Sequence, residues 1–530
     1  MPSPLAQRFD AVVQDYFPAW AAKRNLKRYQ AEVYKRSYEA VNPNSRLRAP
    51  NPFVDAGDAN YANTIAGLEL AKQARYLEQN DPYAKSILDT LVTKTIGTGL
   101  LVKPTAKLLD GSPAEELNAQ LTKLHKAWAK RPDVSGELSY SECQRLAFRS
   151  MLRDGGYFSQ FITGNIKGLT HSSTVQLSLN YLEYDLCPID VNIIPNTKSS
   201  SKIKITVPSG NKVIQGIEFD SFGRVVAYHF YKNHPGDTLA AVEKNVELIR
   251  VDTVDVAHGY LIERIKQTRG VSIFHAVLNL LKDVKEYKES ETVAARIAAA
   301  MVFQIRRDVG MNPNDAHKAL EKTTRDFSIK PGMLFDGLLP GEQAEILSSD
   351  RPNPNLKGFL DTQLRGICAG TYSAFSSVSK DYLGGSYSSQ RQEANENRAS
   401  ILELRQIFIN QHNQPIYQRF VEMCDLQGLI VIPSNIDLDT LFDADFRGPG
   451  MERIDAKAEA DANIQNILAG LKSKTEIILE NGGDPEEVNA QINAERKFAS
   501  ESGLLFSSNL ADVNSYKQTT PVNNAQNTVN

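Results

Sequence analysis

The pattern of hydrophobic residues predicts several helices in the first third of the chain. Apolar side chains recur at helical spacing over residues 64–96, where Asn80-Asp81-Pro82 interrupts the pattern. Two helices should therefore meet at the proline. The same spacing predicts helices over residues 117–128 and 143–152, and Asp154-Gly155-Gly156 should end the second of these.

Between residues 157 and 258 the periodicity changes to that of strands. The turn Asp220-Ser221-Phe222-Gly223 predicts a β-hairpin that continues over residues 225–231. Alternating or β-branched runs predict further strands over residues 157–162, 175–179, 202–207 and 214–219. A β-rich unit should therefore pack on the preceding helices.

A long helix is predicted after the β-rich region. Ser272 can cap a helix whose apolar residues keep helical spacing to about Ile305. At ~1.5 Å per residue, such a helix would be a rod about 50 Å long. A compact insert with strand-like residues 327–329 and 333–335 follows, and a second, shorter helix is expected over residues 355–368.

Residues 371–388, which are rich in Ser, Tyr and Gly, should form a loop after this second helix. Ser389 and Gln392 resemble a capping box, so a long helix is expected to begin there. Pro415 should kink that helix. The stretch Gly448-Pro449-Gly450 should then break the chain.

The C-terminal region is predicted to be helical, and both ends of the chain are polar. Residues 455–480 and 485–499 fit two or three amphipathic helices. Residues 1–60 favour an arm with one helix near residues 17–33, and the chain beyond about Phe506 has little to bury and should be disordered.

The composition is that of an ordinary globular protein, with 41% hydrophobic and 23% charged residues in 530. This length predicts two to four packed units. The net charge of −3 and the pI near 6.3 argue against a protein that grips nucleic acid through many phosphates. No segment has the apolar length of a membrane span and no secretory signal is recognised, so we expect a protein made and used in solution, with no membrane partner.

The sequence shows no local signature of an enzyme or of a cofactor site. The four cysteines lack C-x-x-C spacing, and no phosphate-binding loop, G-x-S-x-G elbow or H-E-x-x-H pair occurs. Gly97-Thr98-Gly99 is too short for a dinucleotide fingerprint. His229 and His234 are close in sequence but lack neighbouring acidic or cysteine ligands, so we interpret them as structural. An active site assembled from distant residues stays open as an alternative.

Four segments, in this order, resemble the lambda-type portal proteins of tailed bacteriophages. The resemblance spans residues 65–503. It departs from the family at Phe446-Arg447-Gly448-Pro449, because the first residue of this stretch is usually tryptophan in the family and is phenylalanine here. The four segments are residues 74–84 with Ile96-Gly97-Thr98-Gly99, residues 216–231 with His234-Pro235-Gly236-Asp237, Arg269-Gly270-Val271-Ser272, and residues 364–370 with Asp381-Tyr382 and Ser386-Tyr387-Ser388-Ser389.

The resemblance implies an α+β portal-protein fold: an α/β wing, a long-helix stem, a small clip insert, a kinked helix and a helical C-terminal crown. Each part corresponds to a region that the residue pattern sets apart. The implied division is an arm (1–60), the wing (61–271), stem helix 1 (272–305), the clip (306–354), stem helix 2 (355–370), a tunnel loop (371–388), the kinked helix with the wing return (389–450), the crown (451–505) and a tail (506–530).

The resemblance also implies a function without catalysis. Portal subunits form a homo-oligomeric ring, usually a dodecamer, at the capsid vertex of the virion, through which double-stranded DNA is packaged and ejected. The implied partners are other copies of the chain, DNA, the major capsid protein, terminase and a head-tail adaptor, with assembly in the host cytoplasm. No cofactor or metal is implied.

The loop over residues 371–388 is the candidate DNA-channel site. Lys380 is its only basic residue, so ring symmetry would repeat it as one sparse ring of positive charge facing phosphates. The alternative is an ordinary solvated lysine. Gly384 and Gly385 would let the segment move as a hinged flap. The other candidate loop residues are Asp381, Tyr382 and Tyr387.

Two other functions are compatible with a chain that lacks catalytic motifs. A head-tail adaptor or another structural ring would also be acidic, but would rarely need 530 residues or an insert between two long helices. An enzyme acting on nucleic acid would reveal itself by metal-dependent turnover.

Overall fold

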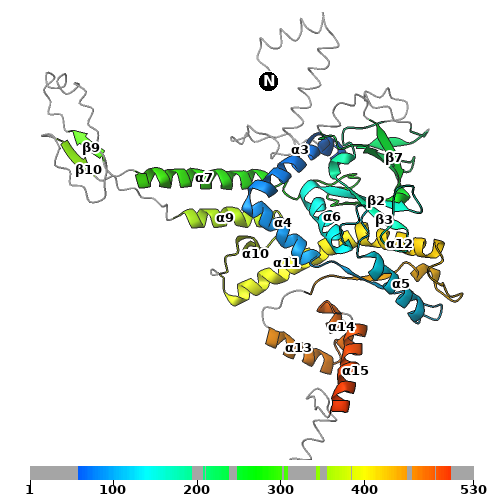
Figure 1. The fold of residues 1–530 in the computed structure, drawn as a ribbon. Coiled ribbons are helices and arrows are strands. Elements are labelled where there is room, and N and C mark those ends of the chain that lie inside the picture. The colour runs from blue at the N-terminus through cyan, green and yellow to red at the C-terminus, as the bar shows by residue number, and fades with distance from the viewer. Residues whose placement is uncertain are drawn as a thin grey trace, which may run out of the picture.

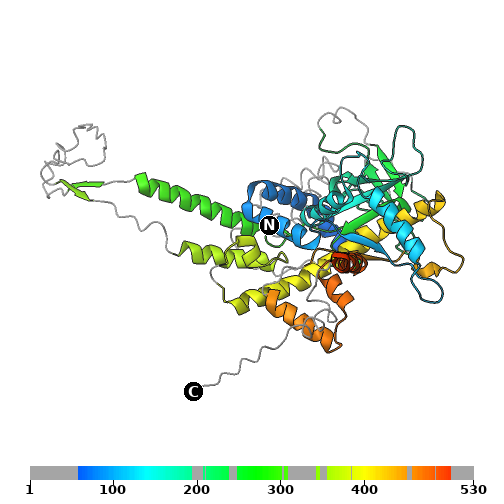
Figure 2. The same ribbon diagram turned by 60° about the horizontal axis from the view of Figure 1, so that its bottom comes forward.

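The computed structural model has a body of helices and sheets, a pair of helices that projects from it and a group of C-terminal helices (Figures 1 and 2). Helices and antiparallel sheets occur together, as expected for an α+β fold. Within the described ranges, no helix has the length and apolarity needed to span a bilayer. The structure describes residues 58–193, 207–208, 210–237, 247–300, 304–307, 342–345, 355–382, 385–450, 456–483 and 485–502.

The first two helices meet at the predicted proline. α3 (Ala59–Asn80) is followed directly by α4 (Pro82–Thr95). The carboxylate of Asp81 accepts hydrogen bonds from two backbone N–H groups in the first turn of α4, at 2.8 and 2.9 Å. Because Pro82 needs no N–H partner at the first helical position, the break in the apolar pattern is a helix-capping site.

α5 (Glu115–Trp128) and α6 (Tyr140–Asp154) confirm the next two predicted helices. α6 begins with a capping box: the Ser139 hydroxyl accepts from the Glu142 N–H, and the Glu142 carboxylate accepts from the Ser139 N–H at 2.8 Å. Gly155 ends the helix with a φ of 97°, a left-handed conformation that glycine adopts readily.

The β-rich region forms two antiparallel sheets. One has the strand order β3-β2-β8 and the other β4-β5-β6-β7. The predicted hairpin is confirmed as the pair β5–β6. The strands are β2 (Gly156–Thr163), β3 (Leu177–Leu182), β4 (Lys212–Ile214), β5 (Ile217–Phe219), β6 (Val225–Tyr231), β7 (Leu248–Asp252) and β8 (Val256–Tyr260).

The prediction of one continuous strand over residues 214–219 is wrong. Gln215 and Gly216 have φ angles of 53° and 78°, so the chain turns there and separates β4 from β5. The buried amide of Gln215 donates to the Asn60 carbonyl at 2.7 Å, a contact with a distant helix that sequence pattern cannot reveal. Of the predicted strand over residues 202–207, all but the last residue lies outside the described residues.

The two projecting helices, α7 (Leu278–Ala300) and α9 (Leu356–Ala369), lie side by side as they leave the body (Figures 1 and 2). The rings of Tyr287 and Phe359 pack between them with centroids 4.8 Å apart. α9 confirms the predicted second helix, with Gly370 directly after it.

The first projecting helix is shorter than predicted at its start. The Ser272 hydroxyl accepts from the Phe274 N–H at 3.2 Å and so stabilises a turn, whereas α7 begins only at Leu278. The turn lets residues 272–277 pass through the core of the body, where Phe274 and Val277 are buried. Ser272, Ile273, Phe274 and Val277 are buried without being helical, so their apolar spacing reflects burial in the core and not a continuation of α7.

The same helix also ends earlier than predicted. Ile305 lies in the short strand β9 (Gln304–Arg307), which pairs antiparallel with β10 (Glu342–Glu345). Residues 304–307 form a strand because they pair with β10, more than thirty residues further along the chain. The spacing of apolar residues cannot indicate such a distant partner. The predicted strands over residues 327–329 and 333–335 lie outside the described part of the chain.

The predicted kink near Pro415 takes the form of a π-helical turn. α11 (Tyr387–Phe408) passes through η5 (Ile409–Asn413) into α12 (Gln414–Leu426), and Figure 1 shows the change of direction. Proline has no backbone N–H to donate to the preceding helical turn, and its ring crowds the carbonyl oxygen of that turn. The wider π-helical turn just before Pro415 gives the ring space.

The chain then returns to the body before its last helices. β11 (Ala444–Arg447) pairs antiparallel with β1 (Leu101–Pro104) from the N-terminal part. The predicted C-terminal helices are confirmed as α13 (Ala456–Leu468), α14 (Lys474–Glu480) and α15 (Pro485–Ser502). Within the described residues there are also three single helical turns: η2 (Tyr184–Leu186), η4 (Thr253–Asp255) and η6 (Leu438–Thr440).

Residues 267–273, which we call the junction segment, cross the end of α6 just before α7. A Cβ atom on Gly270 would lie 2.1 Å from the Gly155 carbonyl oxygen, so the two backbones are in direct contact. The Gly270 carbonyl accepts from the Tyr184 hydroxyl (3.1 Å), and the Arg269 carbonyl accepts from the Asn63 amide (2.7 Å). Three separate parts of the body are thereby fixed to the start of α7.

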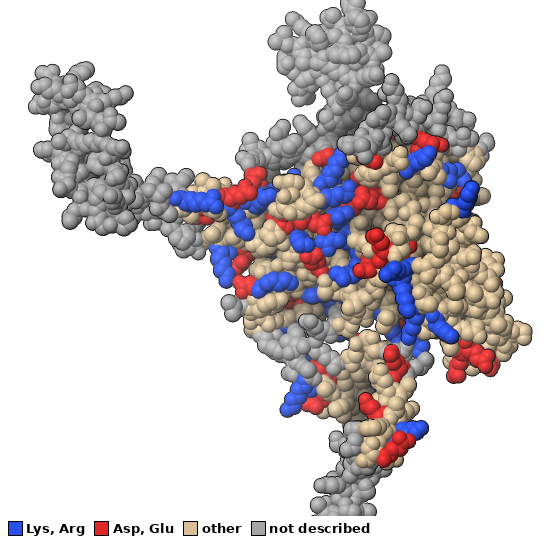
Figure 3. Space-filling model, viewed as in Figure 1, with Lys and Arg blue, Asp and Glu red and all other residues tan. Residues whose placement is uncertain are grey.

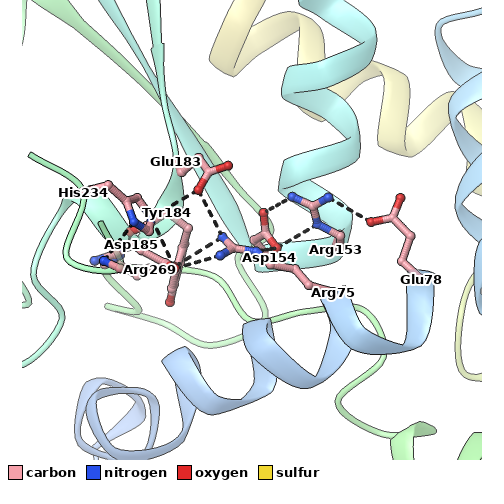
Figure 4. Close-up of polar contacts among 10 residues, drawn as sticks. Arg75, Glu78, Arg153, Asp154, Glu183, Tyr184, Asp185, His234 and Arg269 are labelled. Atoms are coloured by element: carbon pink, nitrogen blue, oxygen red, sulfur yellow. Dashed lines mark hydrogen bonds and ion pairs between the residues drawn. The ribbon is translucent and has the colours of Figure 1, made fainter. Parts of the chain in front are cut away.

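Arg269 of the junction segment is fully buried, and Figure 4 shows its guanidinium beside Tyr184. It donates to the carbonyls of Tyr184 and Cys187 and lies 3.9 Å from the centre of the Tyr184 ring. Carbonyl dipoles and the electron-rich ring face stabilise the buried positive charge.

Beside Arg269, a chain of ion pairs links α3 to the end of α6 (Figure 4). Arg75 bonds to Asp154 (2.8 Å) and to Asp185 (2.7 Å), and Arg153 bridges Asp154 (2.7 Å) and Glu78 (2.8 Å). Burial raises the pKa of Glu78, but hydrogen bonds from arginines outweigh this effect and lower the pKa below its ordinary value. The Glu78 carboxylate is therefore ionised at neutral pH, and the ion pairs hold α3 on α6.

We predict that Gly270→Ala lowers the free energy of unfolding by about 3 kcal/mol or more, because the added methyl group must displace the backbone at Gly155. The matched control is Gly358→Ala in α9, where a Cβ meets no atom within 4 Å. Alanine should be neutral there or should stabilise the helix by roughly 0.5–1 kcal/mol. Urea unfolding of both variants measures the difference, and equal midpoints would contradict the close crossing.

Candidate channel loop

The candidate loop over residues 371–388 is partly helical. The short helix α10 (Phe375–Ser379) forms inside it, directly after α9. Thr371 is fully buried and its hydroxyl donates to the Ile367 carbonyl at 2.9 Å, which ties the start of the loop to the end of α9. The first half of the segment is therefore a fixed part of the body and not a free flap.

Side chains from two longer helices hold α10 in place. From α4, the Ser86 hydroxyl donates to the Val378 carbonyl (3.0 Å) and the Lys94 ammonium donates to the Ser377 hydroxyl (2.7 Å). From α11, the Glu393 carboxylate accepts from the backbone N–H of α10 at 3.2 Å. Sequence reasoning did not identify these supports, because polar residues about 290 positions earlier carry no signal of such a contact.

A second set of contacts fixes Tyr372, three residues before α10. Tyr372 has a φ of 54°, and its carbonyl accepts from the Asn397 amide at 3.0 Å. The oxygen of that amide accepts from Lys94 at 3.3 Å, so one ammonium group holds both Asn397 and α10. On the other side, the Arg365 guanidinium lies 4.3 Å from the centre of the Phe375 ring.

Lys380 ends α10 in a left-handed conformation, with a φ of 57° and its N–H donating to the Ser376 carbonyl (3.0 Å). Its side chain is exposed. The neighbouring carboxylate of Asp381 pairs with Lys357 of α9 at 3.1 Å, and this hydrogen bond raises the pKa of Lys357. Asp381 is thus directed to Lys357, while the side chain of Lys380 lies at the surface.

The remaining candidate residues follow α10 in sequence. The exposed Tyr382 is held through its carbonyl, which accepts from Gln390 at 2.9 Å. Gly385 is exposed, Tyr387 is the first residue of α11, and Gly384 lies outside the described residues. The consecutive residues Lys380, Asp381 and Tyr382 therefore lie directly after α10.

The helix after the loop begins one turn earlier than Ser389 and Gln392 predicted. Its N-cap is Ser386, whose hydroxyl accepts from the Ser389 N–H at 3.3 Å. Gln392 instead donates to Glu396 one turn further along the helix, at 2.9 Å. Two candidate cap serines stand three residues apart, and the structure uses the first, which shortens the loop.

At the loop, the described residues bring charged and hydroxyl groups together, as in the pairs Lys94–Ser377 and Lys357–Asp381. Elsewhere in the body, burial lowers the pKa of His125 to about 4 and of His412 to about 3, so both rings are neutral at pH 7. Burial raises the pKa of the Cys143, Cys368 and Cys424 thiols to about 12 and of Cys187 to about 11, which keeps them protonated. These groups are structural.

The two histidines interpreted as structural do have acidic neighbours in space. His229 is buried against Glu218 at 3.3 Å, and His234 lies 3.3 Å from Glu183. Both histidines therefore have an acidic partner that lies close in space and not in the neighbouring sequence. Even so, the part of the chain that the structure describes contains no group of three or more His, Cys, Asp or Glu side chains able to hold a metal ion.

Comparison with known proteins assigns the chain to a family. A model of the family described as "Phage portal protein, lambda family" matches residues 46–405. The chain is 24% identical over 451 residues to the "Probable portal protein" of Halomonas phage phiHAP-1, covering 84% of this chain and 83% of that protein. It is 21% identical over 249 residues to "Portal protein B" of Escherichia phage lambda, covering 42% of this chain and 47% of that protein.

A chain in the solved structure "Neck of native GTA particle computed with C12 symmetry" is also similar, with a TM-score of 0.42 and 12% sequence identity. The match covers 79% of this chain and 94% of that chain. The family match, by contrast, covers well over half of the sequence. It runs from before α3 into α11 and so includes both projecting helices and the candidate loop. The chain belongs to the lambda family of phage portal proteins.

Proposed function

We propose that this portal protein forms a homo-oligomeric ring, a dodecamer, at the capsid vertex, with a central channel for the packaging and ejection of double-stranded DNA. The observation that carries the proposal is the family match over residues 46–405, which includes the two projecting helices and the loop beside them. In this proposal the chain catalyses no reaction and needs no cofactor. It is assembled in the host cytoplasm and resides in the virion.

The distribution of charge supports a conduit through which DNA slides. Figure 3 shows Lys and Arg interspersed with Asp and Glu over α3, α7 and α9, with no extended field of one sign on that face. The whole chain has a net charge of −3. A strongly basic wall would bind phosphates with release of counterions and would hold the DNA, so a mixed wall favours movement.

The projecting helices support a role in docking. In this proposal α7 and α9 form the stem, and the paired strands β9 and β10 belong to the clip at its end. The clip, residues 306–354, would bind terminase during packaging and the head-tail adaptor afterwards. The wing would contact the major capsid protein.

Ring formation is the direct test of this function. Native mass spectrometry of the full chain at micromolar concentration should show a closed oligomer, with twelve copies as the expected mass. Class-averaged electron micrographs of the same sample should show a central hole. Monomers or dimers alone at these concentrations would contradict the proposal, and a metal-dependent nuclease activity in the same preparation would favour an enzyme.

We predict that Lys380→Ala leaves ring assembly intact and alters the length of DNA retained in reconstituted proheads. The exposed ammonium would contact passing phosphates transiently, so its effect should shrink as salt screens the charge over ~8 Å at physiological ionic strength. The control is Lys126→Ala, an exposed lysine on α5. Loss of rings together with normal DNA handling by the remaining rings would place Lys380 at a subunit interface.

We also predict that Lys94→Met loosens α10 without unfolding the body. Methionine keeps the apolar stem but removes the hydrogen bonds to Ser377 and Asn397. Amide hydrogen exchange over residues 375–382 should accelerate by about tenfold, the equivalent of roughly one lost hydrogen bond. Lys85→Met on the same helix, which pairs with Asp89 at 3.2 Å, is the control. Unchanged exchange in Lys94→Met would show that the other contacts suffice.

A further inference from the structure

The three C-terminal helices α13, α14 and α15, which we call the crown helices, have almost no interior of their own. Of their side chains whose burial is described, only Pro485 and Ala499 are buried. The helices have 13, 7 and 18 residues. Isolated helices of such length are marginal in water unless packing covers an apolar face.

The crown helices nevertheless carry large apolar side chains that face solvent. Ile464 is 55% exposed and Leu468 is 81% exposed, and their spacing of four residues places them on one face of α13. Leu471, Ile492 and Phe498 are also exposed, at 74%, 37% and 62%. A soluble surface rarely holds so many large apolar groups in one short region unless another surface covers them.

The body of the same chain does not cover these side chains. Its contacts with the crown helices involve the turn between α14 and α15: the Arg447 guanidinium donates to the Gly483 carbonyl at 3.4 Å, and a Cβ on Gly450 would lie 2.6 Å from the Asn481 carbonyl oxygen. These contacts attach the crown helices through backbone groups. Figure 1 shows the helices set below the body.

The charge of the region argues for protein, and against DNA, as the covering surface. Residues 456–502 contain five Lys and Arg residues and nine Asp and Glu residues. An excess of negative charge repels phosphates. In a ring, the symmetry axis places the crown helices of every copy at the same height along the channel. The crown helices of one copy therefore lie beside those of the next copy, which carry the same apolar residues.

We propose that the apolar faces of the crown helices pack against the crown helices of the neighbouring copies, and that these helices are stably folded only within the ring. This inference rests on the proposed ring function. In a free subunit the exposed face leaves the helices without enough buried surface to offset the entropy of ordering them. Ring closure supplies that surface, so folding of the crown and assembly are coupled.

Hydrogen exchange of the full chain, measured by mass spectrometry, tests the coupling. One sample is diluted until native mass spectrometry finds monomers, and the other contains rings. We expect amides over residues 456–502 to exchange at least about tenfold more slowly in the ring than in the monomer, since burial of one Leu or Ile corresponds to roughly a tenfold or larger change in an equilibrium constant. Amides of α4 and α6 in the body should stay protected in both samples.

A matched pair of double variants identifies the apolar face. Ile464→Gln with Leu468→Gln removes the stripe on α13 without adding charge, and should raise the concentration at which half of the subunits are in rings by about tenfold or more. The control is Leu109→Gln with Leu438→Gln, which alters two wing residues of similar exposure, 73% and 67%, and should leave assembly unchanged.

The outcomes separate this inference from the ring proposal. Rings that form with crown amides equally protected in monomer and ring, or with assembly unaffected by the Ile464 and Leu468 changes, would overturn the coupling and leave the ring intact. A chain that never forms rings would contradict the proposed function itself. Protection of the crown amides on addition of DNA or another protein to monomers would identify a different covering surface.

Discussion

The contact between Gly155 and Gly270 is the constraint on which the rest of the body depends. It brings the end of α6, the start of β2 and the junction segment into backbone contact, where a single methyl group has no space. Asn63 from α3 and Tyr184 from η2 donate to the carbonyls of the same segment. The direction in which α7 leaves the body is therefore set by hydrogen bonds and steric contact at its root.

The same principle governs the candidate loop. α10 has only five residues and would not be stable alone, but α4, α9 and α11 surround it and Lys94 binds both Ser377 and Asn397. The contacts fix α10 while leaving Lys380 exposed at its end. Under the proposed function, this support would define where the Lys380 charge meets a passing phosphate.

The body and the crown helices illustrate two routes to a stable fold. The body buries Leu, Ile and Phe side chains from α3, α4, α6, α7 and α11 in one continuous core. The crown helices leave their largest apolar side chains exposed and contact the body through backbone groups. If the crown helices fold only on assembly, as proposed, free subunits would lack a folded crown and only closed rings would have one.

The sequence by itself determined the helices α3 to α6, the break at Pro82, the stop at Gly155 and the hairpin β5–β6, because caps, glycines and turn residues act within a few positions of one another. The four motif segments also indicated the family that the comparison confirmed.

Only the tertiary structure decided the rest. The turn at Gln215 depends on a distant helix, β9 replaces the end of the predicted long helix by pairing with β10, and α10 exists because Ser86 and Lys94 reach it from α4. The physical reason is the same in each case: a hydrogen-bond partner that lies tens or hundreds of residues away leaves no mark on the local pattern of polar and apolar residues.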